Sequence, residues 1–300
     1  MFIIFLPYFH HAQLTTAKLP PPTPPGAILL YDLLSNNQTN LDYPEEHLGA
    51  FIAADWQGVG SGIPQQEFDP EACKQNDDTG EITITAQRKP DGRVSTGRIE
   101  TTGIWSTMQS ESIKWHGYIE LKTTLPAKPD GDNFLGSWPG IWLIAADGID
   151  WPQYGEIDIA LLVNGIPDIE MELHSPSHWG GQAQHPPLNP LHVESDLSLN
   201  PLTSGLEWKV DQQEVSLTWH FDWFEQTTES WKHAKTNLTL TENNNSDFFV
   251  FYNSFTKQGF SLIIDLPEGG VMPGTNNVLV DGQPQHIHVS SAKVYTFDTS

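Results

Sequence analysis

The stretch VSLTWHFD, Val215 to Asp222, decides the fold class, because its apolar and polar residues alternate with a period of two. In an extended strand Val215, Leu217, Trp219 and Phe221 share one face. Such alternation is typical of a strand that packs one face against a core and leaves the other face polar. The stretch therefore predicts a half-buried strand of an antiparallel sheet.

Similar short segments recur along the chain and are bounded by Gly, Pro, Asn and Asp. Two of them alternate, EITITAQ and YIELKTTL, and three are short apolar runs, FFVFY, FSLII and KVYTF. We expect strands at Glu81–Gln87, Tyr118–Leu125, Phe248–Tyr252, Phe260–Ile264 and Lys293–Phe297. No long segment with a period of 3.6 residues competes with them. The chain is therefore predicted to be all-β, a sandwich or jelly roll of antiparallel sheets.

The excess of acidic over basic residues restricts the kinds of molecule that the protein can be expected to bind. The 300 residues contain 38 Asp and Glu against 14 Lys and Arg, which gives a formal net charge of −24. An acidic surface repels phosphate, so we expect no nucleic-acid partner. It suits a secreted protein that meets a neutral substrate, and equally a chain that is merely soluble. Cys73 is the only cysteine, so no intramolecular disulfide can form. We expect a monomer.

The chain begins with a short apolar run and a proline-rich stretch. Residues 1–17 are interpreted as a possible signal or leader segment, although they lack a basic start and contain Pro7. Residues 18–26 include LPPPTPP, which predicts an extended spacer. A single domain is expected over residues 27–300, with an extracellular location. Nothing after the leader is long and apolar enough to span a membrane.

Two carboxylates lie two residues apart in GEIDIALLVNG, Gly155 to Gly165. In a strand Glu156 and Asp158 project to the same side, and the intervening isoleucines project to the other. One interpretation is an acid–base or nucleophile site. The other is a solvated outer face behind an inward isoleucine pair.

Aromatic and charged residues near this stretch favour the first interpretation. Trp138 and Trp142 precede it in SWPGIW, and Trp151 follows them; indole faces can stack on sugar rings, although some of the 11 tryptophans must be core residues. His174, in ELHSPSHWGG, could orient a carboxylate through its imidazole. Arg98, in STGRIE, could supply a charge partner for the acids.

Eight segments in a fixed order carry a resemblance to a known family. They lie at residues 95–101, 118–126, 137–159, 163–165, 172–181, 205–211, 259–274 and 288–296. In this order they resemble glycoside hydrolase family 16, the laminarinase and lichenase-type endo-β-1,3(4)-glucanases. The resemblance spans roughly Ala27 to Phe297. It implies a β-jelly roll of two curved antiparallel sheets, concanavalin A-like, that binds β-1,3- or β-1,3/1,4-glucan in a groove on its concave face.

The resemblance also implies roles for particular residues. Glu156 matches the catalytic nucleophile of the retaining mechanism, and Asp158 matches the carboxylate that assists it. The remaining matches are to substrate-binding positions: Trp138 and Trp142 as groove-lining aromatics, Arg98 on the glycone side, and His174 near the nucleophile. No cofactor is implied. A structural calcium ion is frequent in the family, but its usual aspartate position is Ser290 here.

One position departs from the family pattern. The general acid/base glutamate follows in E-x-D-x-x-E or E-x-D-x-E, and those positions hold Leu161 and Ala160. A retaining glycosidase needs this second carboxyl group to protonate the leaving oxygen. Asp168 and Glu170 are the nearest acids in the sequence that could replace it.

Three hypotheses therefore remain open. In the first, the chain is a family 16-type β-glucan endohydrolase. It is either active through a replacement acid, or it descends from such hydrolases and no longer hydrolyses glucan itself. Alternatively it is a non-catalytic β-glucan-binding pseudoenzyme that keeps the aromatic groove. The third is a secreted structural or toxin-like protein for which the sandwich is only a scaffold.

Overall fold

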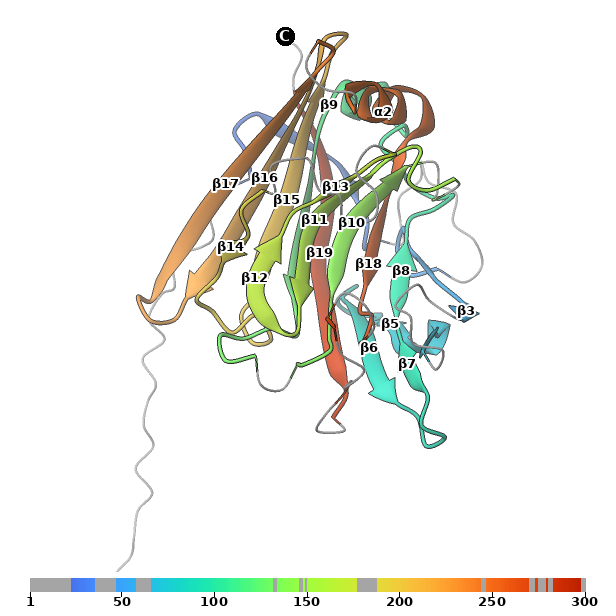
Figure 1. The fold of residues 1–300 in the computed structure, drawn as a ribbon, viewed down its shortest axis with the longest axis vertical. Helices are drawn as coiled ribbons and strands as arrows, with labels where there is room; N and C mark the ends of the chain where they lie inside the picture. Colours follow the sequence, from blue (N-terminus) through green and yellow to red (C-terminus); the bar gives the residue numbers. More distant parts are fainter. Residues whose placement is uncertain are drawn as a thin grey trace, which may run out of the picture.

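The computed structural model describes most of the chain (Figure 1). The described residues are 23–35, 47–57, 66–131, 134–145, 148, 150–176, 188–243, 247–269, 273–274, 279 and 283–297. The predicted leader, residues 1–17, and most of the proline spacer lie outside them. The described residues fold into one unit of two packed sheets.

The all-β prediction is confirmed, and the architecture is a jelly-roll sandwich. The larger sheet has the order β17-β16-β15-β9-β19-β6-β7-β4-β3, with β1 beside β19 and β5 beside β6. All its strand pairs are antiparallel except β4 with β7. Its strands are β1 (Ala27–Asp32), β3 (Trp56–Gln57), β4 (Gln66–Phe68), β5 (Cys73–Gln75), β6 (Ile82–Arg88), β7 (Val94–Thr96), β9 (His116–Thr124), β15 (Leu202–Val210), β16 (Glu214–Glu225), β17 (Ser230–Thr241) and β19 (Gln285–Phe297).

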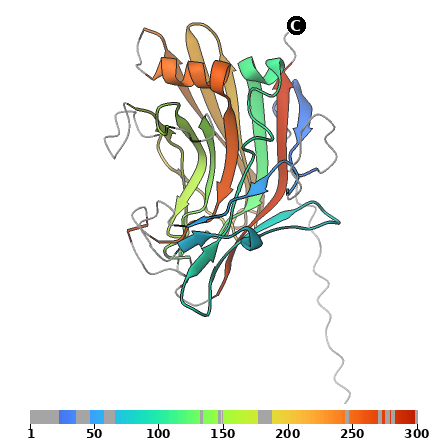
Figure 2. The ribbon, with the colours of Figure 1, turned by 90° about the vertical axis from the view of Figure 1, so that its right-hand side faces the viewer.

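The smaller sheet has the order β14-β12-β11-β10-β18-β8-β2, with β13 beside β11. Its strands are β2 (Ile52–Ala53), β8 (Arg98–Glu100), β10 (Gly140–Ala145), β11 (Glu156–Val163), β12 (Ile166–Glu170), β13 (Leu173–His174), β14 (Leu191–His192) and β18 (Phe260–Asp265). Figure 2 shows β10, β11 and β12 of this sheet (green to yellow-green) on one side of the molecule and β19 (red) on the other.

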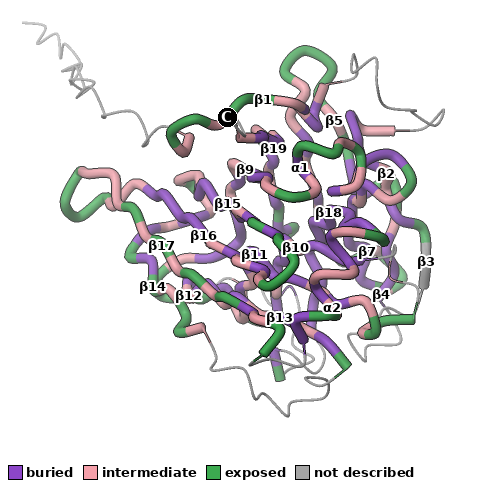
Figure 3. The backbone as a smooth tube through the Cα atoms, turned by 90° about the horizontal axis from the view of Figure 1, so that it is seen from above, coloured by how far each residue is buried: buried purple, intermediate pink, exposed green. Residues whose placement is uncertain are grey.

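The core lies between the two sheets, where Figure 3 shows the purple, buried stretches of chain. The alternating face of β16 enters it as expected, since Val215, Leu217, Trp219 and Phe221 are all buried. The indole N–H of Trp219 crosses the core and donates to the backbone carbonyl of Asp158 on β11, at 2.9 Å. This bond ties the larger sheet to the strand that carries the predicted nucleophile.

Four of the five further expected strands are found: β6, β9 and β18 lie within two residues of their predicted limits, and β19 ends as predicted but begins at Gln285, eight residues before Lys293. The prediction for Phe248–Tyr252 was wrong, because this run forms the helix α2 (Phe248–Asn253). Phe248, Phe251 and Phe255 are buried while Phe249 is 51% exposed, which is the period of a helix and not of a strand. A run of five apolar residues does not reveal that period by itself.

The other helical segments are short: η1 (Pro70–Ala72), α1 (Glu111–Trp115) and η3 (Ser254–Gln258), a single π-helical stretch that continues α2. Gly259, with φ of 86°, ends this stretch and starts β18. Among the described residues, no helix has the length and apolar character needed to cross a membrane.

Candidate active site

Glu156 and Asp158 lie on the face of β11 that points away from the core. Ile157 belongs to the core cluster and is fully buried, so its two neighbours project from the opposite face. Asp158 is nevertheless only 5% exposed. The predicted pair of carboxylates is therefore brought together on the outer face of the smaller sheet, in partly enclosed surroundings.

A β-bulge follows this pair. Asp158 is paired with Trp142 of β10, but Ala160 is paired with the residue directly before Trp142, so Ile159 is an extra residue in β11. Ile159 and Ala160 are both fully buried in the core. Leu161 is half-buried and returns to the outer face. The residue that follows Asp158 on this face is thus Leu161.

His174 lies against both carboxylates. It is paired with Glu156 across β11 and β13. Its Nε2 is 3.1 Å from Asp158 Oδ2, 3.5 Å from Glu156 Oε1 and 3.3 Å from Glu172 Oε2. Burial alone lowers the pKa of His174, but hydrogen bonds to Asp158 and Glu172 outweigh it and raise this pKa to about 11. The imidazole is therefore an imidazolium at neutral pH.

The two carboxyl groups are electrostatically coupled. Burial, followed by the charge of Asp158, raises the pKa of Glu156, while the His174 charge and a hydrogen bond from Trp151 oppose the rise. Burial also raises the pKa of Asp158, against hydrogen bonds from His174 and Glu156. Like charges this close disfavour ionisation of both groups at once, so the two carboxyl groups titrate as a pair.

Trp151 contacts the predicted nucleophile directly. Its indole Nε1 donates to Glu156 Oε2 at 2.8 Å, and its ring centroid is 6.2 Å from that of His174. Its side chain is 43% exposed. The sequence places Trp151 in an aromatic-rich stretch, but no pattern there indicates that its N–H reaches Glu156.

Trp142 of β10, the strand beside β11, meets Arg98 of β8, which lies beyond β18 in the same sheet. The guanidinium of Arg98 lies 4.9 Å from the centroid of the Trp142 ring, in cation–π contact. Arg98 also forms an ion pair with Glu100 at 3.0 Å. Both predicted substrate-binding residues therefore lie on the outer face beside β11, since Trp142 is in register with Asp158.

A third buried carboxylate, Asp265 of β18, joins this group and was not predicted. Its Oδ1 accepts from Trp142 Nε1 at 3.2 Å, and its Oδ2 is 3.8 Å from Arg98. Burial raises the pKa of Asp265 to about 6, although the Arg98 charge lowers it. The Asp265 side chain lies close to the backbone of Gly140, since a Cβ atom added at Gly140 would be only 3.0 Å from Asp265 Oδ1. Only the pairing of β18 with β10 reveals this position.

Trp138 is anchored at the end of β18. Its indole Nε1 donates to the carbonyl of Gly269 at 3.0 Å, and its backbone N–H donates to the carbonyl of Pro267 at 3.1 Å. It lies two residues before β10, and its side chain remains partly exposed. These hydrogen bonds are to backbone atoms of that segment and not to the carboxylates of β11, so its substrate-binding role stays a prediction.

The cluster of Glu156, Asp158 and His174 also has the composition of a metal site. Its ligand atoms lie within 4.8 Å of one another. A histidine must be neutral to coordinate a cation, whereas His174 is held protonated by its acidic neighbours. The residues therefore fit a hydrogen-bonded cluster of side chains better than a metal centre. At Ser290, where the family usually has a calcium-binding aspartate, the hydroxyl donates to the carbonyl of Lys122 at 3.1 Å. The expectation that this chain needs no cofactor stays a prediction.

No family model and no curated protein matches this chain. Solved structures do. The endo-1,3-β-glucanase from Streptomyces sioyaensis has a TM-score of 0.63 at 18% identity, with 93% of this chain and 99% of that chain covered. SCLam, a non-specific endo-β-1,3(4)-glucanase from family GH16, has a TM-score of 0.62 at 20% identity, with 93% and 95% covered. The laminarinase from Rhodothermus marinus has a TM-score of 0.60 at 21% identity, with 94% and 100% covered. Over nearly its whole length, the chain therefore has the fold of the family 16 β-glucanases.

Proposed function

We propose that the outer face of the smaller sheet binds β-1,3- or mixed β-1,3/1,4-glucan, and that Glu156 attacks the anomeric carbon of the bound chain. The observation that carries this proposal is the contact of Glu156 with Asp158, His174 and Trp151 on this face. Trp142 lies in register beside the cluster. Support also comes from the fold, because the structurally similar proteins are β-glucanases.

In this proposal each neighbour of Glu156 has a chemical task. A nucleophilic carboxylate must be ionised, and the Trp151 N–H and the imidazolium of His174 stabilise that ionised form. Asp158 holds His174 and takes part of the charge that builds up as the glycosidic bond breaks. The exposed part of the Trp151 ring and the Trp142 ring offer apolar faces on which sugar rings can stack.

A second candidate function is a β-glucan-binding module without turnover. The observation in its favour is Leu161, the next residue of β11 after Asp158 that faces outward, where a retaining glycosidase of this type would carry its acid/base. Binding depends on the aromatic and polar face and not on that acid. A monomeric, extracellular protein fits both candidates and stays a prediction.

The two candidates separate with an activated substrate. A 2-deoxy-2-fluoro-β-laminaribioside with a 2,4-dinitrophenolate leaving group needs no proton donor for bond cleavage. Under the first proposal, peptide mass spectrometry finds a covalent glycosyl adduct on Glu156, and Glu156→Gln forms none. Retention on a laminarin affinity gel without any adduct assigns the binding module. No adduct and no retention overturns both.

A further inference from the structure

The residue directly opposite Leu161 is an acid. β11 and β12 are antiparallel, and Leu161 is paired with Glu170, beside an irregularity where the register shifts between Leu161 and Val163. Side chains of paired residues lie on the same face, and both of these side chains are half-buried between core neighbours. The position that lacks a carboxyl group on β11 therefore has one on the neighbouring strand.

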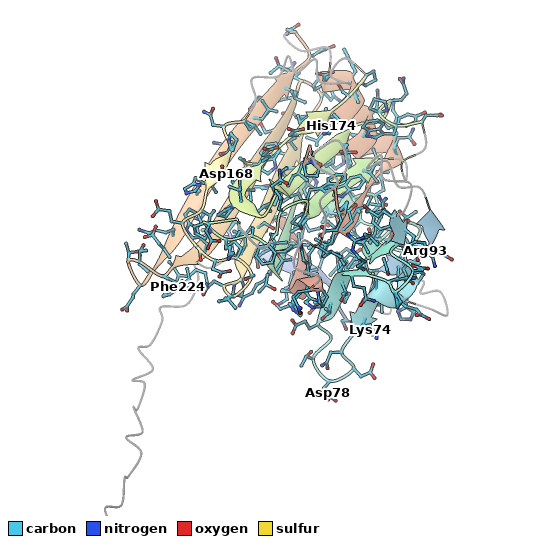
Figure 4. All side chains as sticks on the ribbon, turned by 60° about the horizontal axis from the view of Figure 1, so that its bottom comes forward. Lys74, Asp78, Arg93, Asp168, His174 and Phe224 are labelled. Atoms are coloured by element: carbon cyan, nitrogen blue, oxygen red, sulfur yellow. The ribbon has the colours of Figure 1, made fainter. Side chains whose placement is uncertain are left out.

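Glu170 belongs to the same row of side chains as the candidate active site. Ile169, Met171 and Leu173 are buried in the core cluster, so the alternate residues Glu170 and Glu172 project from the outer face. The next residue of this row is His174, which is labelled in Figure 4. Since His174 and Glu172 already contact the Glu156 cluster, Glu170 continues that row along β11 towards Leu161.

Within the described part of the chain, the carboxyl group of Glu170 makes no hydrogen bond or ion pair. The other acids near it each have such a partner. Asp168 Oδ1 accepts from His192 Nδ1 at 2.5 Å, and Glu172 pairs with His174. Asp265 accepts from the Trp142 indole and lies beside Arg98, and both contacts favour its ionised form. Of these acids, Glu170 is the one whose oxygens are available to a ligand.

The surroundings of Glu170 favour its protonated form. Burial raises its pKa, and the charges of Glu172, Asp168 and Asp158 raise it further. A general acid needs this behaviour, because it must carry a proton at the pH at which its partner carboxylate attacks.

We propose that Glu170 is the proton donor of the reaction proposed above, displaced by one strand from its usual place on β11. This inference rests on the proposed function. In the first step Glu156 Oε bonds to the anomeric carbon, the bond from that carbon to the glycosidic oxygen breaks, and the Glu170 proton passes to the departing oxygen. In the second step the Glu170 carboxylate takes a proton from water, the water oxygen bonds to the anomeric carbon, and the bond to Glu156 breaks.

The test compares Glu170→Gln with the matched variant Asp168→Asn, which removes an acid from the same strand and face. Circular dichroism and thermal melting establish that both variants are folded. On laminarin, whose leaving group needs a proton, we expect Glu170→Gln to lower the release of reducing ends by about 10²- to 10⁴-fold. On the activated dinitrophenyl substrate, adduct formation on Glu156 should change by less than about threefold. Asp168→Asn should stay within about threefold of the unmodified protein in both assays, with only the small shift that follows from losing one of the charges that raise the pKa of Glu170.

Two additions sharpen the test. Azide should accelerate breakdown of the glycosyl adduct in Glu170→Gln, because it needs no general base, and the product should be a β-glycosyl azide. Leu161→Glu in the Glu170→Gln background should restore laminarin hydrolysis, because it supplies a carboxyl group on the paired strand.

Several results would overturn the assignment of Glu170. Unchanged laminarin hydrolysis in Glu170→Gln does so, as does adduct formation by the unmodified protein without any release from laminarin. A loss caused by Asp265→Asn, with Glu170→Gln fully active, moves the donor to Asp265. In each of these cases the adduct on Glu156 still forms and the proposed function stands. Absence of the adduct in the unmodified protein instead defeats the proposed function itself.

Discussion

Trp151 donates its indole N–H to the carboxylate of Glu156 over 2.8 Å. Trp151→Phe keeps an aromatic ring and removes this donor. A hydrogen bond to a charged group contributes about 1.5–3 kcal/mol, so adduct formation on Glu156 should slow roughly tenfold to hundredfold. Because the bond lowers the pKa of Glu156, the variant should also need a higher pH to react. Stopped-flow release of dinitrophenolate against pH measures both effects.

A matched control exists for this substitution. Trp115, at the end of α1, is 38% exposed, close to the 43% of Trp151, and its ring lies under Lys114. Trp115→Phe should leave the rate and the pH profile unchanged. Equal slowing in both variants would contradict a specific role for the Trp151 donor.

In the Glu170→Gln background, Leu161→Glu should raise the hydrolysis of laminarin, because the bulge at Ile159 puts residue 161 on the face of Glu156. Restoring a general acid is worth about 10²- to 10⁴-fold where it is fully effective, and reducing-sugar release measures the gain. Ala160→Glu is the control. Ala160 is fully buried, so this variant should lose several kcal/mol of stability from a buried charge and gain no activity.

The stability of the protein should depend on His174 in a pH-dependent way. The folded pKa of about 11 lies above the ordinary value of 6.5, so the stabilisation from its ion pairs is fully present below pH 6.5. It is lost as the pH rises towards 11. The melting temperature of His174→Gln should therefore lie below that of the unmodified protein at pH 6, and the difference should shrink by pH 10. A constant difference would show that His174 is neutral in the folded protein.

Trp142→Ala should weaken retention on a laminarin gel. Removing a partly buried aromatic face from a ligand costs about 1.5–3 kcal/mol, which is roughly tenfold to hundredfold in affinity. Trp142→Phe keeps an apolar ring and should retain most of the binding, although it loses the bond to Asp265. Equal retention of Trp142→Ala and the unmodified protein would exclude this ring from the binding face.

The strands with a clear period of two were predictable from sequence, because burial of one face determines which residues alternate. In β16 the four apolar residues expected in the core are buried. The same pattern did not predict that His220 and Asp222, on its polar face, are also nearly buried. Their enclosure depends on neighbouring strands, since Asp222 bonds to His233 of β17 and His220 packs on Tyr118 of β9.

The candidate site was predictable only in part, for a related reason. Glu156, Asp158 and His174 come together as the family resemblance implied, and Arg98 meets Trp142. The positions of Asp265 and Glu170 depend on strand order and register. Asp265 is brought to the site by pairing between β10 and β18, which are more than a hundred residues apart, and Glu170 by pairing within the hairpin of β11 and β12. Local patterns do not tell which distant strands pair, and the Asn164-Gly165 turn that joins β11 to β12 does not reveal the register shift that sets Glu170 opposite Leu161.

The bulge at Ile159 makes β11 tolerant of a change in its own length. If Ile159 were deleted, strict alternation from Glu156 through Asp158 would still bring Leu161 to the outer face. A one-residue gain or loss at this point therefore leaves the side chain offered to a ligand unchanged. The length of the strand at this bulge and the chemistry of its outer face are therefore structurally independent, and the residue at position 161 can be exchanged without disturbing the sheet that presents it.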